Sequence, residues 1–264
     1  MNQLKAPIIS NIEAMPGIYL MWLEAPAIAK AAKPGQFVMV NCGGDMVLPR
    51  PFSVHRVDGG QLALLFSVVG KGTMRLSQVK KGDTLNVFGP LGNGFRIDPN
   101  AKNLLLVAGG MGIAPLYFLA EAAAGAGKKV TLINGAKSRD CLLPVSLPQK
   151  YYEKGLPPAG VNVVTATEDG SEGFKGLATQ LVPHYLNSIH QVFACGPAAM
   201  YQSMAKIPEL KGRDVQLSLE IMMGCGVGVC YGCTIKTQNG LKQICQDGPV
   251  FEMGEVDWKK PTGL

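Results

Sequence analysis

Short apolar runs separated by turn residues characterise residues 1–99. The runs cover Ile18–Leu23, Phe37–Val40, Leu62–Val69 and Leu85–Phe88. Glycines separate most of them, and Lys80-Lys81-Gly82-Asp83 forms a turn before the last one. Strands that recur at such short intervals are typical of small antiparallel barrels. We therefore expect residues 1–99 to fold as an antiparallel β-barrel domain.

The rhythm changes after Asp98-Pro99-Asn100, where apolar runs begin to alternate with longer helical patterns. The expected strands are Leu104–Val107, Val130–Ile133, Val161–Val164 and Val192–Ala194. The expected helices are Ala114–Ala124, Leu177–Leu186 and Ala198–Ile207. Alternating strands and helices indicate a parallel sheet that binds a nucleotide at the carboxyl ends of its strands. Residues 100–219 are therefore predicted to form an α/β nucleotide domain.

The regular pattern stops at Glu220, and residues 220–264 are predicted to form a small C-terminal loop domain with an irregular tail. Four of the seven cysteines lie in this segment, with the spacing C-x4-C-x2-C followed by one more after eleven residues: Cys225, Cys230, Cys233 and Cys245. This is the plant-type spacing of a [2Fe–2S] cluster, with a shorter final gap. Glycines among them, at 224, 226, 228 and 232, allow the loop to curl and to aim backbone amides at the sulfurs.

Two other uses of the four cysteines stay open, a tetrahedral zinc knuckle and a pair of disulfides. Zinc sites usually pair one C-x2-C with a second C-x2-C or with histidines, and neither follows here. The iron–sulfur interpretation is therefore favoured. Four cysteines held as thiolates indicate a reducing, cytoplasmic compartment.

Composition restricts the classes of partner. The formal net charge is +6 without a long Lys/Arg run, which does not favour nucleic-acid binding. The uncharged stretch Leu104–Ala120 is seventeen residues long and contains three glycines and Pro115. A buried strand, turn and helix fit that stretch better than a membrane span. We expect neither a nucleic-acid partner nor a membrane partner.

Two segments of the first domain have the residues of a phosphate site. Arg50-Pro51-Phe52-Ser53 begins an expected strand, and an arginine in that place is usually a solvated charge. Farther along, Gly70-Lys71-Gly72-Thr73 opens the expected helix Met74–Val79. A helix N-terminus preceded by glycines binds phosphate readily. The combination favours a role for Arg50 in binding an anion.

The second domain has two comparable segments. Gly109, Gly110 and Gly112 precede the helix that begins near Ala114, and small residues there bring backbone amides close to a diphosphate. This is not a G-x-G-x-x-G fingerprint. Cys195-Gly196-Pro197 follows a later strand. Taken alone, Cys195 is more often a small buried hydrophobic residue than a functional one.

The order of these motifs resembles the ferredoxin–NADP reductase superfamily. The resemblance implies that Arg50 pairs with a flavin phosphate, that Phe52 packs beside the isoalloxazine and that Ser53 lies near the flavin N5. Phe52 departs from the commoner tyrosine and has no hydroxyl to donate. The resemblance also assigns FAD binding to Pro51, Gly70, Lys71, Gly72 and Thr73.

The same resemblance implies that the glycines at 109, 110 and 112 bind NAD, and that Cys195, Gly196 and Pro197 lie beside the nicotinamide. Ser53 and Cys195 are the implied catalytic residues. Acidic residues after a strand, Glu168 and Asp169, favour NAD over NADP because they accept ribose hydroxyls and repel a 2′-phosphate. Lys137 and Arg139 follow a neighbouring strand and could instead contact that phosphate, and a solvated loop is an equally good interpretation of all four.

With the C-terminal cysteines included, the whole chain resembles the electron-transfer subunits of type B dihydroorotate dehydrogenase, an oxidoreductase family of pyrimidine biosynthesis. The stretch Leu219–Gly226 is close to that family's pattern, and Cys225 stands where related ferredoxin reductase subunits tend to have aspartate. The resemblance implies a partner catalytic subunit that contains FMN, a heterotetramer, and electron flow from that FMN through the cluster and FAD to NAD+. The alternatives are a small subunit of another NAD(P)H-dependent ferredoxin reductase or hydrogenase-type complex and, from another class, a zinc-stabilised nucleotide-binding regulatory module.

Overall fold

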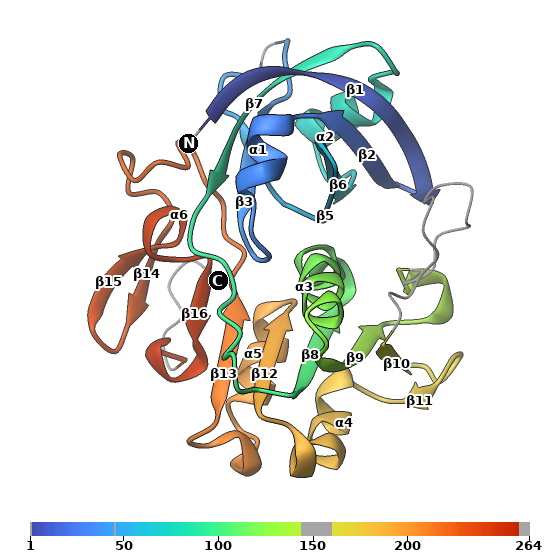
Figure 1. The fold of residues 1–264 in the computed structure, drawn as a ribbon, viewed down its shortest axis with the longest axis vertical. Coiled ribbons are helices and arrows are strands. Elements are labelled where there is room, and N and C mark those ends of the chain that lie inside the picture. Colours follow the sequence, from blue (N-terminus) through green and yellow to red (C-terminus); the bar gives the residue numbers. More distant parts are fainter. Residues whose placement is uncertain (1, 45, 144–159, 259–264) are drawn as a thin grey trace.

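The computed structural model describes residues 2–44, 46–143 and 160–258, and these build two seven-stranded sheets and a two-stranded hairpin. Figure 1 shows the first sheet curled above the second, with the C-terminal segment at one side of both. The end of the predicted C-terminal domain, residues 259–264, lies outside the described residues, as do residues 144–159 of the predicted nucleotide domain.

The first sheet is an antiparallel half-barrel with the strand order β4-β3-β7-β1-β2-β6-β5. Strand β1 joins its two halves, because it pairs with β7 through its first residues and with β2 through its later ones. The elements are β1 (Asn2–Met15), β2 (Ile18–Glu24), α1 (Pro26–Ala31), β3 (Phe37–Asn41), β4 (Arg50–Ser53), β5 (Arg56–Asp58), β6 (Gln61–Ser67), α2 (Lys71–Gln78) and β7 (Thr84–Leu91). The expected antiparallel architecture is confirmed.

The second sheet has the order β11-β10-β9-β8-β12-β13-β16 and is parallel except for its last pair. Residues of β8 alternate between two cores: Leu105 and Val107 face the side of α4, whereas Leu104 and Leu106 face α3. Helices on both faces explain why this strand is apolar without interruption. The elements are β8 (Asn103–Gly109), α3 (Ile113–Gly125), β9 (Lys129–Ala136), β10 (Val161–Thr167), β11 (Phe174–Lys175), α4 (Ala178–Tyr185), β12 (Gln191–Cys195), α5 (Ala198–Met204) and β13 (Asp214–Ser218).

The C-terminal segment is more regular than the expected irregular tail, and that expectation was wrong. It contains β14 (Thr234–Thr237), β15 (Gly240–Gln243), α6 (Ile244–Asp247) and β16 (Val250–Glu252). Strand β16 pairs antiparallel with β13 and so extends the second sheet. At the other end, a Cβ on Gly226 would lie 2.7 Å from Met39 Cγ, so the cysteine loop also packs closely on the half-barrel.

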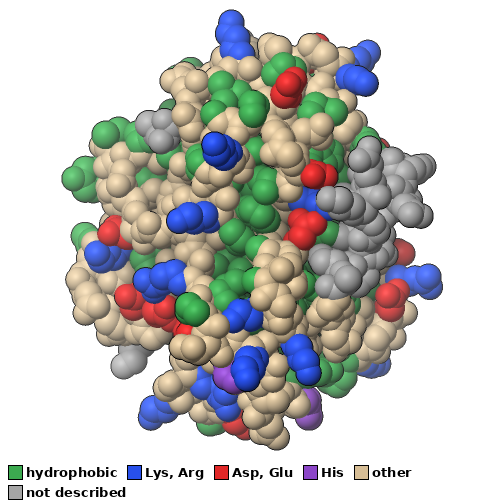
Figure 2. Space-filling model, viewed as in Figure 1, with side chains coloured by type: hydrophobic (Ala, Val, Ile, Leu, Met, Phe, Trp, Pro, Cys, Tyr) green, Lys and Arg blue, Asp and Glu red, His purple; other side chains and the backbone are tan. Residues whose placement is uncertain are grey.

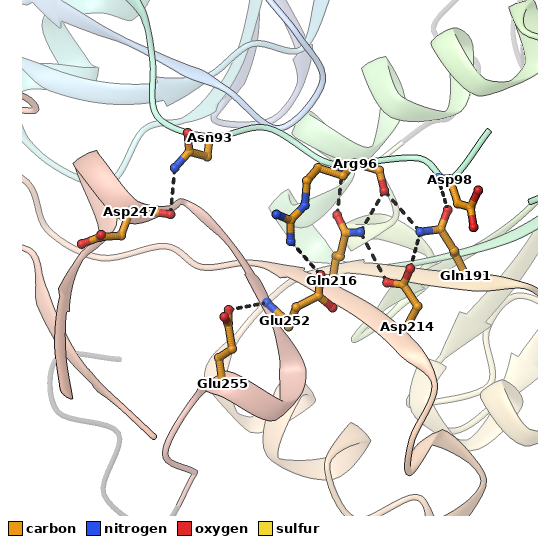
Figure 3. Close-up of polar contacts among 9 residues, drawn as sticks. All are labelled: Asn93, Arg96, Asp98, Gln191, Asp214, Gln216, Asp247, Glu252 and Glu255. Atoms are coloured by element: carbon orange, nitrogen blue, oxygen red, sulfur yellow. Dashed lines mark hydrogen bonds and ion pairs between the residues drawn. The ribbon is translucent and has the colours of Figure 1, made fainter. Parts of the chain in front are cut away.

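The connection between the two sheets is held by buried amide side chains (Figure 3). Gln216 donates from Nε2 to the carbonyl of Arg96 at 2.8 Å, and Gln191 Oε1 accepts from the backbone N–H of Asp98 at 2.8 Å. The guanidinium of Arg96 reaches Glu252 of β16 at 3.0 Å. Backbone groups of the connection therefore have partners in the second sheet, as buried polar groups require.

Surface and helix properties bear on the class of partner. On the face drawn in Figure 2, Lys and Arg side chains are dispersed among Asp and Glu side chains over both sheets. Among the described residues, every helix is too short or too polar to pass through a bilayer.

Candidate nucleotide, flavin and cluster sites

A cavity of about 550 Å³ opens at the carboxyl ends of the parallel strands, where open α/β sheets bind their ligands. Five of the residues predicted to bind NAD line it, from two separate turns: Gly109, Gly110, Gly112, Gly196 and Pro197. The structure therefore brings together the two motifs that the sequence placed about eighty residues apart.

The two turns are in direct backbone contact. A Cβ built on Gly112 would lie 1.9 Å from the carbonyl oxygen of Cys195 and 2.8 Å from the nitrogen of Gly196. Gly110 has a φ of +53°, in the left-handed region that favours glycine. These glycines are therefore required by close approach and by backbone conformation.

Cys195 ends β12 fully buried, and its Sγ lies 3.8 Å from Oε1 of Glu220. Burial raises the pKa of the Cys195 thiol well above its ordinary value, and the neighbouring Glu220 raises it further. The thiol is therefore neutral at physiological pH. The thiol does not line the cavity itself, whereas its neighbours Gly196 and Glu220 do.

Glu220 was missed in the sequence, although it lies two residues after the end of β13, at the same edge of the sheet. The rule that selected Glu168, an acidic residue just after a parallel strand, would have selected Glu220 as well. Glu220 lines the cavity, and burial raises the pKa of its carboxyl above the ordinary value. A group of this kind, next to a buried thiol, is suited to hydrogen bonding with a bound nicotinamide ring.

Of the four residues weighed for cofactor choice, Glu168 and Lys137 line the cavity. Asp169 is not among the lining residues; its carboxylate accepts hydrogen bonds from the Oγ and N of Ser171, at 2.6 and 2.9 Å, which lower its pKa. Arg139 forms an ion pair with Glu172 at 3.4 Å. Of these four residues, one acid and one base therefore line the cavity, and cofactor choice depends on which of the two meets the ribose.

The flavin motif also comes together from two segments. Arg50 donates from Nη1 to the carbonyl of Leu48 at 3.0 Å, and its Nε would lie 3.5 Å from a Cβ on Gly72. Thr73 Oγ1 accepts hydrogen bonds from the backbone of Val69 and Gly70, at 2.9 and 3.2 Å, and so fixes the first turn of α2. A guanidinium beside a helix N-terminus fits a phosphate well.

The remaining residues of this motif lie as strand alternation requires. Phe52 is 9% exposed and packs against Phe66, with ring centroids 5.6 Å apart. Pro51 and Ser53 are half-buried on the opposite side of β4. Lys71 is exposed at the start of α2. The predicted roles of Phe52 beside the isoalloxazine and of Ser53 near N5 stay predictions.

The cysteine loop, residues 224–233, directs backbone amides at its sulfurs as the glycine pattern predicted. Val227 N donates to Cys225 Sγ at 3.4 Å, and Gly232 N donates to Cys230 Sγ at 3.5 Å. Burial acts to raise the pKa of Cys225, but hydrogen bonds from the loop outweigh it and lower the pKa to about 6. The loop therefore favours a thiolate, the form that binds metal.

The four thiols act on one another: Cys225 interacts with Cys230, and Cys245 interacts with Cys233 and with Cys225. Burial, followed by the Cys233 thiol, raises the pKa of Cys245 to about 12. All seven cysteines are free. Among the described residues, no three His, Cys, Asp or Glu side chains lie close enough together to hold one metal ion. A [2Fe–2S] cluster of the plant type takes four cysteine thiolates as ligands, and these four cysteines supply that number.

Comparisons with known proteins agree with this geometry. Residues 220–257 match the iron–sulfur cluster binding domain of dihydroorotate dehydrogenase B, and residues 106–206 match the oxidoreductase NAD-binding domain. A solved structure of an NADH-dependent reduced ferredoxin–NADP oxidoreductase superposes with a TM-score of 0.83 at 32% identity, covering 96% of this chain and 90% of the other.

Two relatives carry the name dihydroorotate dehydrogenase B (NAD+), electron transfer subunit. The protein of Desulforamulus reducens is 39% identical over 266 residues, which cover 96% of this chain and 98% of the relative. The protein of Caldanaerobacter subterraneus is 38% identical over 258 residues, which cover 96% of this chain and 98% of the relative. Because these similarities extend over nearly all of both chains, this chain belongs to the family of electron-transfer subunits of dihydroorotate dehydrogenase B.

Proposed function

We propose that this chain relays electrons between NAD+ and a catalytic partner that oxidises dihydroorotate. The observation that carries the proposal is the presence, in one chain, of a nucleotide cavity, a flavin-phosphate turn, and a cysteine loop with a fourth cysteine in α6. When bound, FAD supplies the change between two-electron and one-electron transfer, and a [2Fe–2S] cluster supplies one-electron transfer.

The chain's own residues bind and orient these groups. Arg50 and the first turn of α2 would hold the FAD phosphates, with Pro51, Phe52 and Ser53 beside the ring. Gly109, Gly110 and Gly112 would hold the NAD diphosphate, and the Cys195-Gly196-Pro197 turn would position the nicotinamide. The four cysteines at 225, 230, 233 and 245 would ligate the irons. Ser53 is the proposed catalytic residue next to the flavin N5. Cys195, which is buried and does not line the cavity, is proposed to act by shaping the turn beside the nicotinamide.

We place FAD binding in residues 1–99, NAD binding in residues 100–219 and cluster binding in residues 220–264. The catalytic partner is proposed to contain FMN and to form a heterotetramer with this chain in the cytoplasm. The family to which the chain belongs supports the partner, and seven free thiols support a reducing compartment.

The proposal is tested by cofactor analysis of the purified protein. Prepared without its partner, the chain should contain about two irons and about one FAD, and NADH should reduce a dye in its presence. Stoichiometric zinc without iron after anaerobic preparation would contradict the proposal and favour a zinc-stabilised module.

A second candidate is a small subunit of another NAD(P)H-dependent ferredoxin reductase complex, favoured by the 32% identity to the oxidoreductase structure. Reconstitution separates the two. Dihydroorotate-dependent reduction of NAD+ with the co-purified catalytic chain supports the first, whereas a ferredoxin-reducing partner chain supports the second.

A further inference from the structure

Two residues beyond Ser53, the chain makes a hydrogen bond into the nucleotide domain. His55 is 3% exposed, and its Nδ1 lies 2.9 Å from the carbonyl oxygen of Ala114. A carbonyl oxygen only accepts, so Nδ1 carries the proton and donates it. Ala114 stands two residues after Gly112, at the start of α3. This bond therefore joins the segment just after the flavin strand β4 to the first turn of α3.

The next residue makes a second connection to the same helix. Arg56 pairs with Glu121 at two points, Nη2 to Oε1 at 2.8 Å and Nε to Oε2 at 3.1 Å. The arginine side chain is 4% exposed and that of the glutamate 29%. A two-point contact between a guanidinium and a carboxylate fixes direction as well as distance.

The contacts along α3 lie on one face of the helix. Ala114, Tyr117, Phe118 and Glu121 are spaced as i, i+3, i+4 and i+7, which places them on a single stripe. The ring of Tyr117 lies 4.9 Å from that of His55, and Phe118 is buried in the half-barrel core. Figure 1 shows α3 between β5 of the half-barrel and β8 of the second sheet.

We propose that His55 and Arg56 are positioning residues that set the placement of the flavin strand β4 relative to the diphosphate loop, residues 109–112. The proposal rests on the proposed function, because it takes the flavin to lie at β4, the NAD diphosphate at residues 109–112 and the nicotinamide at the adjoining Cys195-Gly196-Pro197 turn. This connection begins and ends close to the proposed sites. Ser53 is two residues from His55, and Gly112, two residues before Ala114, abuts the carbonyl of Cys195.

Two further observations agree with a fixed connection. Burial lowers the pKa of His55 to about 4, so the imidazole is neutral and its single Nδ1 proton is available to Ala114. The backbone N–H of His55 also donates to the carbonyl of Ala63 in β6 at 3.0 Å. The side chain thus starts from a segment between β4 and β5 that is itself hydrogen-bonded to β6.

The test measures how fast NADH reduces the bound flavin in the holoprotein, by stopped flow without oxygen. Arg56→Met combined with Glu121→Leu removes both charges together, which leaves no unpaired buried charge to unfold the protein. We expect a ten- to hundredfold slower flavin reduction at saturating NADH, since a displacement of about 1 Å can cost a hundredfold in rate. FAD and iron contents should stay at the wild-type level.

His55 is tested by a pair of variants that differ in hydrogen-bonding capacity. His55→Gln retains an N–H donor and should keep most of the rate, whereas His55→Phe retains the ring shape without a donor and should lose it. Asp257→Asn, which breaks the Lys236–Asp257 pair at 3.3 Å in the C-terminal segment, is the matched control and should reduce flavin at the wild-type rate.

A second readout does not depend on turnover. Amide hydrogen exchange over the first turns of α3 is measured in protein freed of nucleotide. It should be faster in the Arg56→Met/Glu121→Leu variant and in His55→Phe than in wild type or Asp257→Asn. Wild-type flavin reduction in variants with full FAD content, or unchanged exchange in α3, would overturn the proposal. If wild type itself binds no FAD or is not reduced by NADH, the proposed function fails instead, so the two failures are distinguishable.

Discussion

Substitution of Gly112 tests the contact between the diphosphate loop, residues 109–112, and the Cys195-Gly196-Pro197 turn. A Cβ at Gly112 would lie 1.9 Å from the carbonyl oxygen of Cys195 and 2.3 Å from its carbonyl carbon. Real Cβ contacts stay above 3.0 Å, so Gly112→Ala must separate the two backbones by at least 3.0 − 1.9 = 1.1 Å. Both partners are backbone atoms, and no rotamer change relieves the overlap.

The expected cost follows from that displacement. Overpacking of a tight contact costs about 1–3 kcal/mol of unfolding free energy. A shift of about 1 Å between reacting groups can cost a hundredfold in rate. We therefore expect Gly112→Ala to lower the free energy of unfolding by about 1–3 kcal/mol and NADH–dye turnover by about a hundredfold.

Gly125→Ala is the matched control, because Gly125 is the last residue of the same helix and a Cβ there meets nothing within 4 Å. Alanine is the better helix former by about 1 kcal/mol, so this variant should be as stable as wild type or slightly more so. Chemical denaturation and NADH-dependent dye reduction on both variants give the two quantities. If Gly112→Ala matches Gly125→Ala in both, the two turns are not packed as described.

Three further predictions concern single side chains. Arg50→Ala should weaken FAD retention by about 1.5–3 kcal/mol and Arg50→Lys by less, because lysine lacks the two-point contact; equilibrium dialysis of the flavin measures both, and unchanged affinity in the alanine variant would make Arg50 a surface charge. Glu168→Gln should raise kcat/KM for NADPH relative to NADH, and a wild type that already prefers NADPH would instead assign the ribose to Lys137. The folded-state pKa of His55 is lowered from 6.5 to about 4, so its neutral form stabilises the fold above pH 6.5. That contribution, at most about 3 kcal/mol, is lost as the pH falls from 6.5 towards 4. The unfolding free energy of wild type should therefore fall more steeply over this window than that of His55→Phe, and parallel curves would contradict the pKa assignment.

Strands with strong local patterns could be predicted from the sequence. Strand β8 was expected at Leu104–Val107 and spans Asn103–Gly109, because a strand covered on both faces is apolar throughout. Strand β1 was missed although it is fourteen residues long, because only Ala6 and Ile8 among its residues are buried and polar residues flank its one short apolar run. Strand β16 was missed since its three residues gain stability only from pairing with β13.

Site residues show the same division. Sequence patterns pointed to the four cysteines because their spacing reflects metal-binding chemistry. They also pointed to the glycines at 109, 110 and 112 and to the Cys195-Gly196-Pro197 turn, because these residues allow close backbone contact. His55 carries no local signal, since its partner Ala114 lies on another domain and accepts through its backbone. Asp169 was expected beside Glu168 in the cavity, yet its carboxylate bonds to Ser171 in its own turn, a local preference typical of aspartate.

The central claim is that electrons pass between NAD and the catalytic partner through the cluster. Cys230 is exposed in the cysteine loop and receives a hydrogen bond from Gly232. Serine is a poor ligand for these irons, so Cys230→Ser should lose or badly weaken the cluster. The flavin turn and the nucleotide cavity lie in other segments, and NADH–dye activity should persist.

The decisive measurement takes iron content, FAD content, dye reduction and partner-coupled turnover on one preparation of Cys230→Ser, reconstituted with the catalytic subunit. We predict little iron, full FAD, near wild-type dye reduction, and partner-coupled turnover lower by orders of magnitude. Wild-type partner-coupled turnover in a preparation shown to lack iron would contradict the account, because the cluster would then lie off the electron path.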